Sequence, residues 1–262
     1  MDIVTIQRLM ARTWPGLEQE RMGEWELRAA GGFTGRANSA SPLGDPGCPL
    51  DEALDRVEHW YRRRGLAPRL QVPASLDGSA GPSDEIGLLC ARRGWTADPW
   101  TLVMVRAARP DRIAPGHGTD EPALGDAAAL DLRCASEPDQ AWLDVYHYRG
   151  SQLPPTARRV ITAAPAWYLT ARLRGELVGI GRAAVAGDVV VLTAIEVVAA
   201  HRRRGFGAVI TEALASRGAD VGATLSALQV FAHNQPAQRL YRRLGYVDHH
   251  RYRYQCEAEP QI

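Results

Sequence analysis

The chain contains no lysine: all 31 of its basic residues are arginines, and 30 acidic residues leave a formal net charge of only +1. A nucleic-acid-binding protein usually carries a larger excess of positive charge, because its affinity comes from neutralising many phosphates. The near balance of charge therefore argues against a nucleic-acid-binding module. It also makes any cluster of arginines a local feature rather than part of a basic field.

The sequence also lacks the segments that mark membrane, secreted and metal-binding proteins. No stretch approaches the roughly 20 apolar residues that a membrane-spanning helix needs, and the first ten residues lack the basic start and apolar core of a signal peptide. The four cysteines form no Cys-x-x-Cys pair and no cluster with metal-ligand spacing. We therefore expect no membrane partner, no metal, free thiols and a cytoplasmic location, with two disulfides as the alternative for the cysteines.

One segment divides the chain. Ala108–Ala123 is rich in proline, glycine and aspartate and has no periodic apolar pattern, which is typical of a linker. It predicts a first domain over residues 1–107, a linker over 108–122 and a second domain over 123–262. Each part has the size of an ordinary small domain, and a hydrophobic content of 45% supplies enough apolar material for two cores.

The two halves resemble each other near their ends. Leu-Gln-Val occurs at Leu70–Val72 and again at Leu228–Val230. Each copy is followed by a helical segment that ends in a glycine and an aromatic residue, at Gly94–Trp95 and at Gly245–Tyr246. This shared order indicates a duplicated domain rather than a solenoid, which needs several shorter repeats.

The second half has the clearer pattern of elements. Strand-like runs separated by Arg174–Gly175 and Ala186–Asp188 predict three antiparallel strands with tight turns. A helix is expected from Gly205 to about Gly218, followed by a strand over Leu225–Phe231. Pro236 suits the first turn of another helix.

The first half is predicted to repeat this order in a thinner form. We expect a hairpin around Gly31–Gly32, because paired glycines favour a tight turn. A helix is expected from Leu50 to about Arg64. The strand that contains Leu70–Val72 follows it.

The stretch His-Arg-Arg-Arg-Gly-Phe-Gly, residues 201–207, places three arginines directly before two glycines. It lies between the end of a predicted strand near Val198 and the start of a helix near Gly205. A helix start offers unpaired N–H groups and partial positive charge, and glycine lets the backbone approach a ligand closely. These features favour a pyrophosphate site. A solvated basic turn is the alternative.

The residues around this loop resemble the acetyl-coenzyme A (acetyl-CoA) signature of the GNAT (GCN5-related N-acetyltransferase) superfamily. The first motif of that family, V-x-P-x-x-[QR]-x-x-G-x-[GA], is matched by four residues, with Ala199 in place of the proline: Val197, Arg202, Gly205 and Gly207. The second motif, N-x-x-A-x-x-L-Y-x-x-[LM]-G-[FY], is matched by Asn234, Ala237, Leu240, Tyr241, Leu244, Gly245 and Tyr246. The resemblance covers roughly residues 126–254. It implies an α/β (α+β) fold of two tandem GNAT-like domains, each a bent mixed β-sheet flanked by helices.

The resemblance also implies acetyl-CoA as the acetyl donor and a primary amine as the acceptor. Backbone N–H groups of six consecutive residues would hold the pyrophosphate: Arg203, Arg204, Gly205, Phe206, Gly207 and Ala208. Val197 and Val198 would pair with the pantetheine arm, and the N–H of Val198 would polarise the thioester carbonyl. Asn234 and the neighbouring Ala237 would lie along the arm, and Arg202 would add positive charge at the rim.

Two residues are candidates for proton transfer. The resemblance places Tyr241 near the sulfur, where it would protonate the leaving thiolate, although a phenol with a pKa of about 10 is a weak acid. Packing of the helix is its other interpretation. Glu196 is a carboxylate in an otherwise apolar strand, which is costly unless it is hydrogen-bonded, paired or exposed. It is a candidate base for the amine, and a structural ion pair is the alternative.

Asn234 and the histidines near the motifs also have interpretations that involve no catalytic role. Asn234 suits a helix cap beside Pro236 as well as a contact with the donor. Positioning of the reactants, without any base, is also sufficient for the chemistry in this family. Four histidines near the motifs have no motif support as catalytic residues: His201, His233, His249 and His250.

The first half lacks the phosphate loop. Asn38–Leu50 stands where that loop is expected, but it has no Arg-x-x-Gly-x-Gly, and Asp45 would repel phosphate. Alignment on the glycine–aromatic pair sets Cys90 opposite Tyr241. We therefore expect a degenerate N-terminal GNAT domain, which either lines the acceptor pocket through Gly31–Ser39 or serves only as a packing partner.

The leading hypothesis is an N-acetyltransferase in which the amine attacks the acetyl group directly. A non-catalytic acyl-CoA-binding sensor is the alternative. Fold does not fix substrate, so small amines, antibiotics and protein N-termini all stay open as acceptors. The oligomeric state is also open, with a homodimer among the options.

Overall fold

The structure, a computed structural model, describes residues 1–78, 82–109, 130–147 and 153–257. The predicted linker at 108–122 lies almost entirely outside these residues. The described chain forms two compact units. The first unit comprises Met1–Leu102, Pro154–Ala163 and the residues from His249 on, and the second unit comprises the described parts of Val103–Leu153 and Ala164–Asp248.

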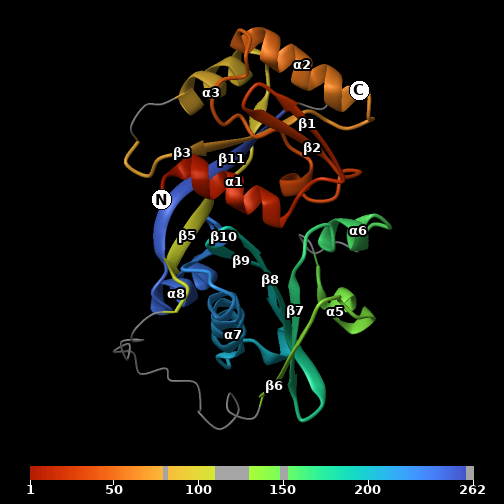
Figure 1. Cartoon of the computed structure of the whole chain (residues 1–262), viewed down its shortest axis with the longest axis vertical. Coiled ribbons are helices and arrows are strands. Elements are labelled where there is room, and N and C mark those ends of the chain that lie inside the picture. The colour runs from red at the N-terminus through yellow and green to blue at the C-terminus, as the bar shows by residue number, and fades with distance from the viewer. Residues whose placement is uncertain (79–81, 110–129, 148–152, 258–262) are drawn as a thin grey trace. The chain divides into compact units, whose positions relative to one another are not determined.

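The first unit opens with a helix and a hairpin (Figure 1). Its elements are α1 (Ile3–Thr13), β1 (Glu18–Met22), β2 (Trp25–Ala29), η1 (Gly35–Ala37), α2 (Leu50–Arg62), β3 (Arg69–Ala74), α3 (Pro82–Arg92), β4 (Thr96–Ala97) and α6 (Ala157–Ile161). The hairpin turns between Met22 and Trp25, which lie opposite each other. The hairpin predicted around Gly31–Gly32 is therefore wrong.

Gly31 and Gly32 instead open a loop that is held from inside. Both have a positive φ, as a turn would require. However, Asn38 takes the place of a second strand, because its side-chain oxygen accepts hydrogen bonds from the backbone N–H groups of Ala30 and Gly32 at 2.7 and 2.9 Å. Its side-chain nitrogen donates to the carbonyl of Phe33 at 2.7 Å. A side chain that satisfies backbone groups in this way competes with a strand ladder.

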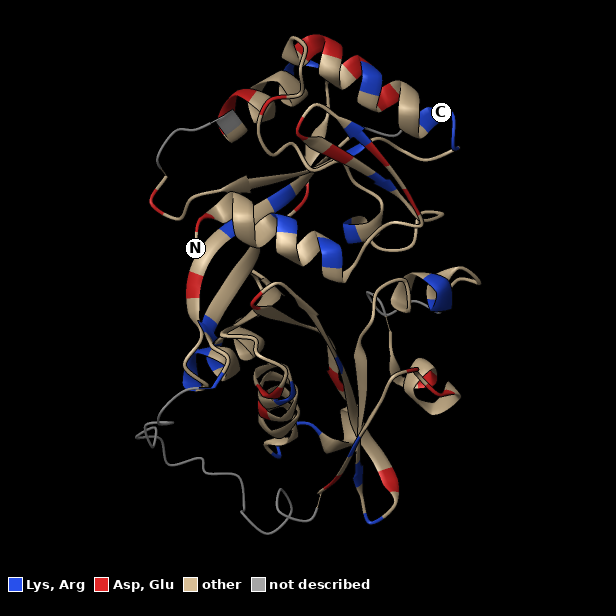
Figure 2. Ribbon diagram, in the orientation of Figure 1, with Lys and Arg blue, Asp and Glu red and all other residues tan. Residues whose placement is uncertain are grey.

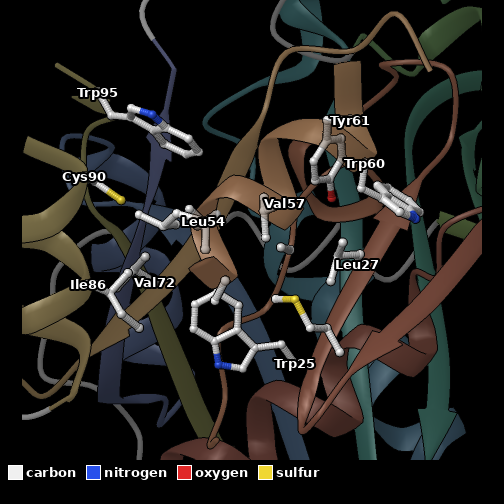
Figure 3. Packing of buried hydrophobic residues seen from close by; sticks show 14 of the residues in the cluster. Trp25, Leu27, Leu54, Val57, Trp60, Tyr61, Val72, Ile86, Cys90 and Trp95 are labelled. Carbon is white, nitrogen blue, oxygen red and sulfur yellow. The ribbon is translucent and has the colours of Figure 1, made fainter. Parts of the chain in front are cut away.

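The core of the first unit lies between α2, α3 and the strands (Figure 3). Its buried members include Trp25, Leu27, Leu54, Val57, Trp60, Tyr61, Val72, Ile86, Cys90 and Trp95. The predicted helix at Leu50 and the predicted strand at Leu70–Val72 are both confirmed as parts of this core. β1 and β2 form a two-stranded antiparallel sheet. Two isolated bridges lie beside it: Glu26 of β2 pairs antiparallel with Ser41, and Ala40 pairs parallel with Leu70 of β3.

The second unit contains the predicted three-strand meander. Its elements are β5 (Thr101–Ala107, which enters the unit at Val103), β6 (Leu130–Ala135), α5 (Gln140–Val145), β7 (Trp167–Leu173), β8 (Glu176–Ala186), β9 (Val189–Val197), η2 (Ala199–His201), α7 (Phe206–Asp220), β10 (Leu225–Phe231) and α8 (Gln235–Arg243). The strand order is β5-β10-β9-β8-β7-β6. β9 and β10 are parallel, whereas β6 to β9 are successively antiparallel. The sheet is therefore mixed, as predicted.

Each unit includes a strand from the other half of the chain. β5 follows α3 yet pairs with β10, and β11 (Val247–Cys256) follows α8 yet pairs with β3. Arg106 of β5 is anchored by Glu212 of α7 through two hydrogen bonds of 2.7 and 2.8 Å. Gln7 of α1 contacts His250 of β11 at 2.7 Å. The compact units thus differ from the contiguous domains predicted, because the last strand of each half completes a sheet that local sequence patterns do not specify.

Candidate functional site

The arginine–glycine loop leads directly into α7. Gly205 is the N-cap residue, with a φ of +79° that favours glycine, and no side chain caps the helix. The first turn contains no acidic residue. Within the described chain, the backbone N–H groups of Gly205, Phe206 and Gly207 donate to no backbone carbonyl. The start of α7 therefore offers unpaired donors and partial positive charge to an anion.

The three arginines of the loop have different surroundings. Arg202 donates from Nε to the carbonyl oxygen of Val197 at 3.1 Å, which ties the loop to the end of β9. Arg204 lies 3.2 Å from Nδ1 of His201. Arg203 is exposed and has a φ of +64°, and its side chain pairs with no other described residue. Arg202 and Arg203 are both exposed, so both guanidinium groups are accessible to a phosphate.

Helix α8 packs against the first turn of α7. A Cβ atom added to Gly207 would lie 3.2 Å from Cδ2 of Leu240 in α8 and 3.8 Å from Val197, so a larger residue here would need a small shift of Leu240. At the start of α8, the side-chain oxygen of Asn234 accepts a hydrogen bond from the N–H of Ala237 at 3.2 Å. The helix-cap interpretation of Asn234 is confirmed, and its contact with the donor stays a prediction.

The strands β9 and β10 pair only along part of their length. Their ladder ends at Leu192 and Leu228, although β9 continues to Val197 and β10 to Phe231. A register shift against β8 and the positive φ of Ala194, +52°, mark a bulge just beyond the last pair. Past this bulge, the end of β9 has no ladder partner on β10. An extended ligand can pair with such backbone groups as an added strand does.

Two backbone N–H groups differ from the predicted arrangement. The N–H of Val198 donates to the carbonyl of Val178 at 3.0 Å, because this residue still pairs with β8. The N–H of Ala208 donates to Gly205 at 2.9 Å, because the first turn of α7 closes there. Successive N–H groups of a strand point to opposite edges. The N–H of Val197 therefore points to the edge of β9 that β10 no longer pairs with. This makes Val197 the better candidate to polarise a thioester carbonyl.

Tyr241 lies on α8 and is almost buried, with 8% of its surface exposed. Its ring packs edge-to-face against Tyr246, with 5.9 Å between the centroids. Burial raises the pKa of Tyr241 above its usual value, with a smaller effect from Tyr246. The phenol therefore keeps its proton at neutral pH but is a weaker acid than an exposed tyrosine, and its packing matches the alternative interpretation.

Glu196 has a partner that the sequence did not reveal. Its carboxylate accepts a hydrogen bond from the backbone N–H of His147 at 3.1 Å and lies 3.4 Å from Nδ1 of that imidazole. His147 follows α5 and belongs to no motif, so no signal in the sequence pointed to it. The alternative in which Glu196 forms an ion pair therefore gains a named partner.

The donor loop and Glu196 lie on opposite faces of β9. The side chain of Val197 faces α7, as its distance to Gly207 shows. Successive side chains of a strand alternate between faces, so Glu196 faces the other side. That side carries α5, whose Trp142 donates from Nε1 to the carbonyl of Gly181 in β8 at 3.3 Å. The end of β9 thus presents side chains to both faces of the sheet.

The described residues bear on three expectations from composition. The four cysteines are free thiols. Among the residues that the structure describes, no group of three or more His, Cys, Asp or Glu is arranged to hold a metal ion. None of the helices in that part of the chain is long and apolar enough to cross a membrane.

Comparison with known families decides the identity. The family described as "Probable histone acetyltransferase Rv0428c C-terminal" matches residues 1–255. The chain belongs to this family. Two relatives are 25% and 28% identical to this chain. They are "Uncharacterized N-acetyltransferase YobR" of Bacillus subtilis and "Probable histone acetyltransferase Rv0428c" of Mycobacterium tuberculosis. Each alignment covers 96% of this chain, with 98% and 73% of the respective relative.

Solved structures show the same fold. A GCN5-related N-acetyltransferase from Kribbella flavida has a TM-score of 0.72 and 16% identity, with coverage of 100% of this chain and 98% of that one. A tandem GNAT protein from the clavulanic acid biosynthesis pathway has a TM-score of 0.60 and 17% identity, with coverage of 86% and 76%. The family match and these relatives make the chain an acetyltransferase of the GNAT superfamily, and the solved structures show that its fold matches a tandem GNAT protein.

Proposed function

We propose that the protein is an N-acetyltransferase that binds one acetyl-CoA per chain in its second unit and moves the acetyl group to a primary amine. The observation that carries this proposal is the uncapped, acid-free start of α7 beside the unpaired end of β9. The residues fit a pyrophosphate. The N–H groups of Gly205 to Gly207 and the free guanidinium of Arg203 supply donors and charge.

The proposed chemistry needs a neutral amine, a polarised carbonyl and a protonated leaving group. The N–H of Val197 points to the edge where the thioester carbonyl would lie. Tyr241 keeps its proton at neutral pH and donates it to the leaving thiolate. The amine loses its proton on the face of β9 that carries Glu196, away from α7. Orientation of the two reactants at the strand end supplies much of the remaining acceleration.

We also propose that the first half of the chain binds no donor. The N-cap residue of α2 is Pro49, and Asp51 and Glu52 lie in the first turn, where they would repel a phosphate. Cys90 occupies the position that corresponds to Tyr241. The predicted domains at 1–107 and 123–262 then have different roles, with the donor site in the second alone.

The acceptor is tested with a panel of primary amines. One relative is named as a probable histone acetyltransferase, so a lysine-containing histone-tail peptide comes first, followed by spermidine and an aminoglycoside. Release of CoA is followed with a thiol reagent, and calorimetry counts the acetyl-CoA bound. One acetyl-CoA per chain with amine-dependent CoA release supports the proposal. Binding without release for every amine would favour the acyl-CoA sensor, and absence of binding would refute both.

A further inference from the structure

His147 and Glu196 form a side-chain pair beside the proposed acetyl-transfer site. Glu196 directly precedes Val197 in β9, so the pair lies within one residue of the backbone group that faces the thioester. We propose that His147 removes the proton from the attacking amine. Glu196 would position the imidazole and balance its positive charge. This inference rests on the proposed function and specifies where the amine proton goes.

The contacts of His147 determine which ring nitrogen is available. Nδ1 lies 2.6 Å from the carbonyl oxygen of Val145 and 3.4 Å from a carboxylate oxygen of Glu196. Both neighbours are hydrogen-bond acceptors, so the proton of the neutral imidazole belongs on Nδ1. Nε2 then keeps its lone pair. Within the described chain Nε2 has no partner, so it is the nitrogen that accepts a proton.

The exposure of the two side chains matches these roles. The side chain of His147 is 51% exposed, whereas that of Glu196 is 25% exposed. The imidazole is therefore accessible to an incoming amine and to bulk water, to which it can pass the proton. Glu196 accepts a second hydrogen bond, from the backbone N–H of His147 at 3.1 Å, which holds the carboxylate against the loop.

The resulting step balances. The ammonium of the acceptor gives one proton to Nε2 of His147, and the freed nitrogen lone pair attacks the acetyl carbonyl carbon. A C–N bond forms, the C–S bond breaks, and the thiolate takes the proton of Tyr241. The acetylated nitrogen loses a second proton, which restores Tyr241 through water, and His147 releases its own proton to solvent. The sum is ammonium plus thioester giving amide, thiol and one proton.

The pair is built on a fixed strand and a short helix. Glu196 lies in β9, whose ladder with β8 pairs Glu196 with Ile180. On the other side, the N-cap residue of α5, Asp139, accepts a hydrogen bond from the N–H of Trp142 at 2.7 Å, and Trp142 is fully buried. The segment that carries His147 therefore leaves a helix that is anchored to the same sheet as Glu196.

The test removes the imidazole and then supplies it again. In the full chain, His147→Ala should lower kcat about 100-fold, the lower end of the range for general base catalysis, with unchanged acetyl-CoA affinity by calorimetry. Free imidazole at tens of millimolar should restore part of kcat. The control is His59→Ala, an exposed histidine of α2 outside the site, which should keep full kcat and show no imidazole effect.

Glu196 is tested as a positioning residue. Glu196→Gln should lower kcat in the wild-type background but add little to His147→Ala, because residues that act as a unit are not additive. Full kcat in His147→Ala, or a loss of kcat that imidazole does not relieve, would overturn this inference. The proposed function would still stand if the wild-type protein shows amine-dependent turnover. Lack of turnover by the wild type with every amine would overturn both.

Discussion

The two helix pairs of the chain, α2 with α3 and α7 with α8, end in the same way. Gly94 and Gly245 follow the second helix of each pair with φ values of +77° and +82°. The next residue then donates its N–H to the helix, Trp95 to Cys90 and Tyr246 to Tyr241, both at 3.0 Å. These matching hydrogen bonds make Cys90 and Tyr241 structural equivalents. Tyr241 is the proton donor that we propose, whereas Cys90 lies in the core of the first unit (Figure 3).

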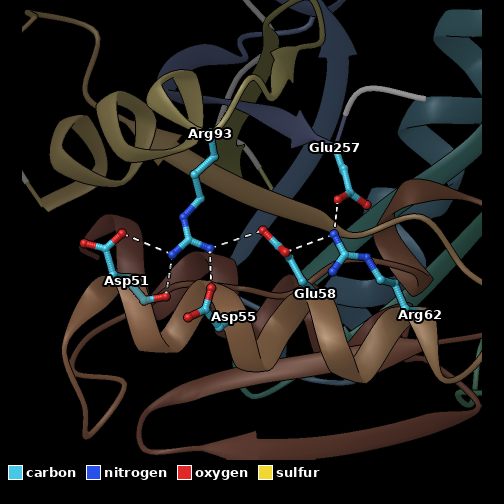
Figure 4. A network of polar contacts seen from close by, with 6 residues as sticks. All are labelled: Asp51, Asp55, Glu58, Arg62, Arg93 and Glu257. Carbon is cyan, nitrogen blue, oxygen red and sulfur yellow. Dashed lines mark hydrogen bonds and ion pairs between the residues drawn. The ribbon is translucent and has the colours of Figure 1, made fainter. Parts of the chain in front are cut away.

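The first helices of the pairs begin differently. α7 starts at a glycine, with no acid in its first turn, whereas α2 starts at Pro49 and carries acidic residues from its first turn onward (Figure 2). Arg93, just after α3, pairs with three of the acids on α2 (Figure 4): Asp51, Asp55 and Glu58. Three acids of α2 are therefore paired from within the first unit, and the first turn of the helix presents Asp51 and Glu52 to any phosphate.

The parallel strand pair also differs between the units. In the second unit β9 is nine residues long and runs past its ladder with β10. In the first unit the same place is held by a single parallel bridge between Ala40 and Leu70. The comparison teaches that the helix–strand framework survives on core packing alone. The donor site that we propose, in contrast, needs a strand end, a glycine and an uncapped helix that the core does not maintain.

The largest effect is expected from the equivalent pair Tyr241 and Cys90. Tyr241→Phe keeps the ring and its packing on Tyr246 and removes only the hydroxyl, so acetyl-CoA affinity should change little. Turnover should fall by about 10²–10⁴-fold, the usual range for general acid catalysis. Steady-state kinetics with the best amine, together with calorimetry, measures both quantities.

Cys90→Ser is the matched control, and it should leave turnover nearly intact. Loss of acetylation in a folded Cys90→Ser protein would give the first unit an active part in catalysis. Unchanged turnover in Tyr241→Phe, with chemistry limiting the rate, would mean that the thiolate leaves without this acid.

Low pH should lower the free energy of unfolding mainly through a buried histidine of the first unit, His250. Burial, with a smaller effect from His249, lowers the pKa of His250 to about 3, against about 6.5 in an unfolded chain. Between these values only the unfolded chain binds the proton, so the free energy of unfolding falls as the pH drops from about 6.5 toward 3, by up to about 1.4 kcal/mol per pH unit. The buried histidine of the second unit, His201, differs in having a carboxylate, Glu176, 3.0 Å from Nε2.

Urea unfolding at pH 7, 5.5 and 4 measures this dependence. His250→Gln removes the titrating group and should flatten the fall of the unfolding free energy with pH, whatever its effect at pH 7. His59→Gln, at an exposed position, should keep the wild-type slope. An unchanged slope in His250→Gln would show that other groups cause the acid sensitivity.

The start of α7 is tested by two substitutions at one residue. Gly205→Glu forces a side chain into a left-handed conformation and places a negative charge at the proposed phosphate site. A like charge about 6 Å away at a surface dielectric costs about 3 kcal/mol, so acetyl-CoA should bind about 100-fold more weakly. Gly205→Asn is the control, because asparagine tolerates this conformation, and its affinity should stay within about 10-fold. Equal affinities for both variants, or two acetyl-CoA per chain, would contradict a single site at this loop.

Much of the fold and of the loop could be predicted from local sequence. The strand over Leu225–Phe231 and the helix after Gly205 were predicted because apolar periodicity and glycine positions act within a few residues. The pairing of β5 with β10 and of β11 with β3 could not be predicted, because the sequence pattern of a strand does not specify which strand it pairs with. His147 was missed for a similar reason, because its meeting with Glu196 depends on how α5 packs on the sheet. The hairpin around Gly31–Gly32 was wrong because the side chain of Asn38 took over the backbone bonds.

The smallest effect concerns the ion-pair network that closes the first unit's helix pair. Arg93 is 21% exposed and contacts Asp51, Asp55 and Glu58 at 3.1, 2.6 and 3.2 Å. Exposed ion pairs contribute little singly, but a network around one arginine contributes more. Arg93→Ala should therefore lower the free energy of unfolding by about 1–2 kcal/mol in urea.

The Arg93→Ala substitution should not create a second acetyl-CoA site, because the acids it releases repel phosphate and Cys90 still replaces the phenol. Arg92→Ala, one residue earlier and exposed, should have a smaller effect on stability. A stoichiometry of two in Arg93→Ala would mean that this one arginine, rather than the whole start of α2, keeps the first unit from binding the donor.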